Sequence, residues 1–181
     1  MTKYLKLTED QLPLNITPKI ILVPHAGLEY SGFCAATAYN CVKKHKYKGI
    51  ILLCTYHDIS SYDNGLIVYD KNTNMPENIN VTENKELFSK EHSYGNNMIF
   101  INEIFKGVPV TAFLAGHKTN YQTFAKYLSD LIDKKYLLVV TTDLSHVGQR
   151  FNSKIYKIFF LFFIYTIISN SSSSPITCIS R

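Results

Sequence analysis

The chain has 181 residues, of which 46% are hydrophobic, and a formal net charge of +5. This length and apolar content fit one globular domain with a core of two or three layers. The lysines are scattered, and no zinc-finger, aromatic-platform or helix-turn-helix pattern accompanies them, so we expect no nucleic-acid partner. The four cysteines form no CxxC pair, and the N-terminus lacks an apolar secretory core; both features predict a cytoplasmic protein.

Four apolar runs have the length and composition of buried β-strands. They cover 20–24, 49–55, 108–115 and 136–142, and a histidine follows each: His25, His57, His117 and His146. Helical patterns separate the runs, which predicts an α/β fold with a mostly parallel sheet flanked by helices. Because the carboxyl ends of parallel strands meet at one sheet edge, we expect imidazoles to converge there, together with Asp143. His117 matches no motif, and we expect it in a surface loop.

The first half of the chain also carries helix and turn signals. Residues 1–19 are polar and contain two prolines, which predicts an arm without a long helix. Ser31 is a candidate N-cap for an Ala-rich helix at 33–42, on which we expect Cys34 and Cys41 to be small core residues. A weakly alternating run at 65–70 predicts a strand at the sheet edge.

The middle of the chain is more polar. Residues 71–91 are rich in Asn, Lys and Glu, which predicts a surface excursion with a short helix at 84–90. Ser93 is a candidate N-cap for the next helix, with His92 on the loop before it. Residues 121–133 alternate as an amphipathic helix.

The last thirty residues break the pattern. The run 155–168 is apolar without a helical or strand period. It is shorter than the ~20 residues that a spanning helix needs and contains Lys157, so we do not expect a membrane anchor. We expect a partial domain at 1–153 and a divergent tail at 154–181. The apolar run is either buried in the domain or part of a tail that was never selected to fold.

Several short motifs occur in a fixed order within residues 18–153. They are Val23-Pro24-His25-Ala26-Gly27 with Tyr30-Ser31-Gly32, then Leu53-Cys54-Thr55-Tyr56-His57, Glu91-His92-Ser93, and Thr142-Asp143-Leu144-Ser145-His146. In this ordered set the chain resembles the MEMO family (mediator of ErbB2-driven cell motility, also called the AmmeMemoRadiSam system protein B family). The resemblance implies a fold similar to that of class III non-haem iron extradiol dioxygenases.

The resemblance also implies a metal pocket. The family holds its metal with two histidines, which correspond to His25 and His57, and with a cysteine from a later Cys-Gly motif. We expect the chain to end before that motif, because Cys178 lacks its glycine and its following residues. Asp143 and His146 correspond to residues that line the same pocket, and His92 falls in the family's Glu-His-Ser motif.

Three positions depart from the family pattern. Tyr56 replaces the first histidine of a His-His pair. Gly95 and Asn97 stand where the family more often has a glutamate and a second histidine.

The donor types limit the metal and the chemistry. Imidazole with thiolate favours iron or copper over Mg²⁺ or Ca²⁺. Asp143 either completes a 2-His-1-carboxylate set or orients His146. His92 and His146 are candidate proton donors or acceptors, which makes them candidate catalytic residues with Asp143.

Three functions stay open at this point. The first is a MEMO-like protein with a redox-related iron or copper pocket. The second is a non-catalytic interaction module that binds a peptide or protein ligand, for example phosphotyrosine near Arg150. The third is an inactive, truncated gene product with marginal stability and weak metal affinity. Ring-cleaving dioxygenase activity would rest on fold analogy alone.

Overall fold

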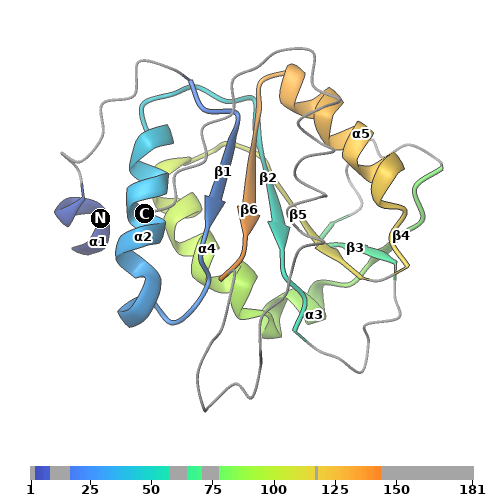
Figure 1. The fold of residues 1–181 in the computed structure, drawn as a ribbon, viewed down its shortest axis with the longest axis horizontal. Coiled ribbons are helices and arrows are strands. Elements are labelled where there is room, and N and C mark those ends of the chain that lie inside the picture. The colour runs from blue at the N-terminus through green and yellow to red at the C-terminus, as the bar shows by residue number, and fades with distance from the viewer. Residues whose placement is uncertain (1–2, 9–16, 58–64, 71–77, 117, 144–181) are drawn as a thin grey trace.

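The computed structural model describes residues 3–8, 17–57, 65–70, 78–116 and 118–143, which form one sheet flanked by helices (Figure 1). In chain order the described elements are α1 (Lys3–Leu7), β1 (Ile20–Val23), α2 (Leu28–Val42), β2 (Gly49–Cys54), β3 (Leu66–Val68), β4 (Val81–Glu83), α3 (Lys85–Lys90), α4 (His92–Ile104), β5 (Val110–Ala115), α5 (Tyr121–Asp133) and β6 (Tyr136–Thr141). The α/β architecture predicted from the alternation of patterns is confirmed, and the four apolar runs are β1, β2, β5 and β6. No helix within these ranges is long and apolar enough to cross a membrane.

The strand order places the first and last described strands side by side. The order is β1-β6-β2-β5-β3-β4, and every pair is parallel except β3 with β5. In register, Val23 lies beside Thr141 at the end of β1, and Leu53 of β2 lies beside Val140. The residues that follow β1, β6 and β2 therefore emerge at the same edge, although more than one hundred positions separate the first from the last.

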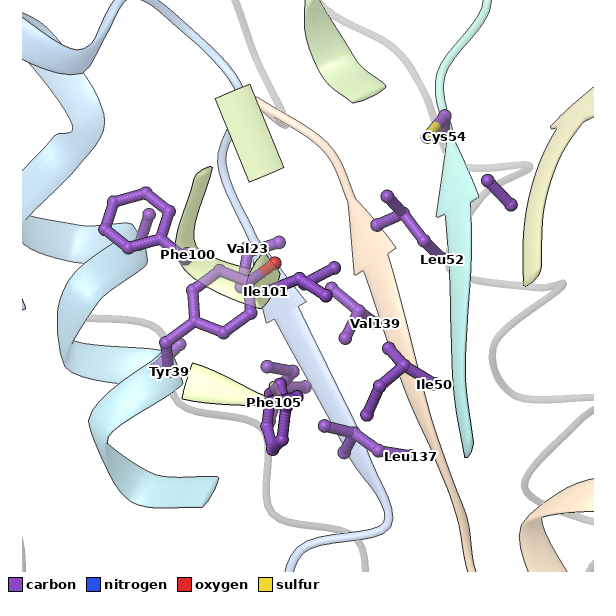
Figure 2. Packing of buried hydrophobic residues seen from close by; sticks show 14 of the residues in the cluster. Val23, Tyr39, Ile50, Leu52, Cys54, Phe100, Ile101, Phe105, Leu137 and Val139 are labelled. Atoms are coloured by element: carbon purple, nitrogen blue, oxygen red, sulfur yellow. The ribbon is translucent and has the colours of Figure 1, made fainter. Parts of the chain in front are cut away.

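Helices cover both faces of the sheet, and each face has its own apolar cluster. On one face α2 and α4 pack over the strands, with α1 against α2 and α3 against α4. Figure 2 shows Tyr39 of α2, Phe100 and Ile101 of α4, and Phe105 just after α4, together with the strand residues Ile50, Leu52, Leu137 and Val139. On the other face α5 packs through Phe124, Ala125, Leu128 and Ile132. All six residues of β2 are buried, as expected of a central strand covered on both sides.

One buried hydrogen bond locks α2 to α4. The Tyr39 hydroxyl donates to Asn97 Oδ1 at 2.9 Å, and both side chains are almost fully buried. Burial raises the pKa of Tyr39 well above its ordinary value, so the hydroxyl stays a donor at all relevant pH. Asn97, where the family more often has a histidine, is thus a structural residue that faces away from solvent.

Two local predictions were wrong near the start of α2. The helix begins at Leu28 with Gly27 at its N-cap, because Tyr30 N–H and Ser31 N–H already bond to the Gly27 carbonyl. Ser31 lies inside the first turn, where its hydroxyl donates to the Ala26 carbonyl at 2.9 Å. Cys41 is buried as expected, whereas Cys34 faces solvent.

The predicted edge strand at 65–70 is not at the edge. It forms β3, whose three residues are all buried because β4 pairs with its outer side. β4 lies within the segment predicted as a surface excursion, and most of its surface is exposed. The short helix expected at 84–90 is confirmed as α3, with Asn84 at its N-cap.

Candidate metal centre

Three histidines lie together at the carboxyl edge of the sheet. His25 follows β1, His57 follows β2, and His92 is the first residue of α4. Their ring centroids are 5.1 Å apart for His25 and His57, 5.6 Å for His25 and His92, and 4.1 Å for His57 and His92. One nitrogen from each ring lies within 4.8 Å of the other two. Side chains from three separate elements thus place their donor atoms in one small volume.

Asp143 fixes the loop that carries His25. Its Oδ1 accepts the backbone N–H groups of His25 at 2.6 Å and of Ala26 at 3.0 Å, and its Oδ2 lies 3.6 Å from His25 Nε2. The Asn96 side chain supports the same loop, since its amide donates to the His25 and Ala26 carbonyls. The end of β1 is therefore held by the carboxylate of Asp143, two residues after β6, and by one amide from α4.

His25 is the buried member of the cluster, with 2% of its surface exposed. Burial lowers its pKa to about 4, although Asp143 acts in the opposite direction. His57 and His92 also disfavour a charge on this ring. His25 is therefore neutral at pH 7, the state in which an imidazole binds metal. Among the described residues, its Nδ1 is a buried polar atom without a hydrogen-bond partner.

His57 is more exposed, and Glu91 holds it at two points. Its Nδ1 lies 2.7 Å from Glu91 Oε1, and its backbone N–H donates to Oε2 at 3.0 Å. Only 4% of the Glu91 side chain is exposed. Burial by itself raises the pKa of Glu91, but hydrogen bonds from His57 and from Ser93 N–H lower it to about 2. Glu91 is consequently a carboxylate at neutral pH.

The start of α4 differs from the prediction in two ways. The N-cap is Glu91, whose side chain accepts Ser93 N–H, so Ser93 is not the cap. His92 belongs to the helix and does not lie on the loop before it. Ser93 is instead fully buried, and its hydroxyl donates to the Thr55 carbonyl at 2.6 Å. This bond ties α4 to the residue that follows β2.

His92 is the exposed member of the cluster, with 52% of its side chain accessible. Its Nδ1 lies 3.6 Å from Glu91 Oε1. His57, with 38% of its side chain exposed, and His92 make the cluster accessible to solvent, whereas His25 lies on its buried side.

The other candidate residues fall into two groups. His117, His146 and Arg150 lie outside the described residues, as do Cys178 and the segment 154–181. Tyr56 is described and buried, and its hydroxyl has no hydrogen-bond partner within the described ranges. Sequence reasoning missed Glu91 and Asn96 as site residues. A signal for Glu91 was present, because it is the first residue of the Glu91-His92-Ser93 motif.

The donor set of the cluster fits a first-row transition metal. Neutral imidazole suits iron, copper and zinc, whereas Mg²⁺ and Ca²⁺ prefer oxygen ligands. The buried Nδ1 of His25 without a partner is also costly in a dry environment unless something binds near it.

The chain was also compared with known proteins. The model of the Memo-like protein family matches residues 1–160, a range that contains His25, His57, His92 and Asp143. A search of curated proteins gave no match.

Proposed function

The chain belongs to the Memo-like protein family, and we propose that it binds iron or copper through His25, His57 and His92, in a redox-related role. One observation carries this proposal: the three rings come from three different elements, and one nitrogen of each lies within 4.8 Å of the others. The family resemblance supports His25 and His57 as ligands, and the geometry adds His92.

We assign His92 as the third nitrogen ligand of the cluster. It is closest to His57, with a centroid distance of 4.1 Å, and it is accessible to an incoming ion. From sequence it was a candidate proton donor, whereas the geometry favours a ligand role. Asp143 then acts on His25 through the loop, while His146 keeps its predicted role as a proton donor or acceptor.

Bound iron or copper supplies one-electron chemistry at such a site, and the protein supplies position and protonation state. Asp143 and Asn96 hold the loop of His25 in place. Burial keeps His25 neutral, so no proton has to leave this ring when a metal binds near pH 7. The exposed rings of His57 and His92 provide the route by which ions enter.

Metal titration of the full chain tests the proposal. The wild type and the His25→Ala, His57→Ala and His92→Ala variants are titrated with Cu²⁺, and with Fe²⁺ in the absence of oxygen. Each variant should bind more weakly by a larger factor than the ~10–100-fold typical for loss of an outer-shell partner. His45→Ala is the matched control, because His45 lies away from the cluster beside Thr17 and Tyr47.

Two results would contradict the proposal. Equal Cu²⁺ uptake by the wild type and by the His25→Ala, His57→Ala double variant would rule the site out. Full affinity in His92→Ala would return His92 to a proton-transfer role. The redox part is tested separately, by reducing bound Cu²⁺ with ascorbate and following its paramagnetic signal during reoxidation in air.

A further inference from the structure

We propose that Glu91 is a positioning residue that commits His57 to bind metal through Nε2. This inference rests on the proposed function, because it concerns how one of the three ligands is presented. It starts from the contact between His57 Nδ1 and Glu91 Oε1, at 2.7 Å the shortest contact described for either side chain.

The neighbouring hydrogen bonds favour Glu91 as the acceptor in this contact. Glu91 Oε1 also accepts Ser93 N–H at 3.0 Å, and Oε2 accepts the His57 backbone N–H at 3.0 Å. Both oxygens thus accept N–H donors, as expected of a carboxylate, and we assign the proton between Glu91 and the ring to Nδ1. A neutral imidazole with its proton on Nδ1 has its lone pair on Nε2. Nε2 is then the nitrogen that is free to bind a metal.

The carboxylate itself is held rigidly. Glu91 caps a helix of 13 residues, where the N-terminal end of the helix dipole favours a negative charge. Its side chain is buried, and the Ser93 hydroxyl pins the same turn to the Thr55 carbonyl at the end of β2. The position of Glu91 relative to His57 is thus set by the contact between α4 and β2.

The same helix start also carries His92, the next residue along the chain. Glu91 orients one ligand while its neighbour provides another, so a single helix turn sets the spacing between His57 and His92. Histidine ligands in metal sites usually donate their second N–H to a carboxylate or a carbonyl, which fixes the tautomer and raises the basicity of the ligand nitrogen. Loss of such a partner typically lowers metal affinity ~10–100-fold.

The first experiment needs no metal. The tautomer of His57 is read from nitrogen-15 NMR of the metal-free full chain at pH 8, with His57→Gln used to assign the signals. The wild type should carry the proton on Nδ1. In Glu91→Ala the ring should show a mixture of both tautomers. Protonation of Nε2 in the wild type would overturn the inference, whatever the variants do.

The second experiment measures Cu²⁺ affinity and the paramagnetic resonance spectrum of bound Cu²⁺. Glu91→Ala should weaken binding ~10–100-fold and change the spectrum, and Glu91→Gln, which keeps a neutral acceptor, should fall in between. Glu86→Gln is the matched control, because Glu86 is an exposed glutamate paired with Lys90 on α3. It should bind Cu²⁺ like the wild type.

The outcomes separate this inference from the proposed function. Cu²⁺ binding that depends on His25 and His57 but is the same in Glu91→Ala would overturn the inference alone. Absence of both Cu²⁺ and Fe²⁺ binding by the folded wild type would overturn the proposed function, and the inference with it.

Discussion

Replacing Asp143 with alanine should weaken the attachment between the ends of β1 and β6. Asp143 Oδ1 accepts two backbone N–H groups, at 2.6 Å from His25 and 3.0 Å from Ala26, and 11% of its side chain is exposed. The alanine variant leaves both donors without this acceptor. Because both hydrogen bonds are partly buried, water replaces the carboxylate only in part.

The expected magnitude follows from the two hydrogen bonds. Hydrogen bonds to a charged group contribute ~1.5–3 kcal/mol each, and partial access of water reduces the loss. We therefore expect Asp143→Ala to lower the free energy of unfolding by about 3 kcal/mol, a large share of the ~5–15 kcal/mol typical of a domain. Asp143→Asn keeps one neutral acceptor at the Oδ1 position and should cost about 1 kcal/mol.

Urea unfolding of the metal-free full chain, with a chelator present, measures both values. The urea dependence should stay constant, so that a lower midpoint reports lower stability. If Asp143→Ala lies within about 1 kcal/mol of the wild type, the two bonds do not hold the loop and the reasoning is wrong. Equal losses in the alanine and asparagine variants would show that the charge, and not the acceptor, is what matters.

Two further predictions concern burial. Tyr39→Phe leaves Asn97 Oδ1 without its donor at 2.9 Å and should lower the free energy of unfolding by ~1–3 kcal/mol. The control Tyr30→Phe, at an exposed tyrosine, should have little effect. Equal effects of the two substitutions would contradict this prediction. Burial lowers the pKa of His25 from 6.5 to about 4, so the unfolded chain takes up this proton at a higher pH than the folded chain does. The free energy of unfolding therefore decreases as the pH is lowered from about 6.5 to about 4. The loss should reach about 3 kcal/mol in the metal-free protein and be absent in His25→Gln, as unfolding curves at several pH values would show.

The strands were predictable from the sequence because the central sheet is buried on both faces. β2 is apolar at almost every position, and such a run predicts a strand without any knowledge of its neighbours. β4 could not be found this way. The strand has three residues, Val81, Thr82 and Glu83, which are mostly exposed and partly polar. They form a strand only because the neighbouring β3 has a free edge with which they pair.

The residues of the site that closely follow a strand were predictable from the sequence. His25, His57 and Asp143 each follow an apolar run, and parallel pairing brings such positions together. Glu91 follows no strand, and a glutamate is normally exposed. Its burial depends on His57, thirty-four positions earlier, and on the turn that it caps; no local pattern encodes that pairing.

X-ray absorption spectroscopy of the full chain loaded with Cu²⁺ tests the central claim most directly, because it reports which atoms surround the metal. Binding at the histidine cluster predicts imidazole nitrogen at ~2.0–2.1 Å, as in other histidine metal sites, with the imidazole signal reduced in His92→Ala and lost when His25 and His57 are both replaced. A spectrum with only oxygen neighbours, or an imidazole signal unchanged in the double variant, would contradict the claim.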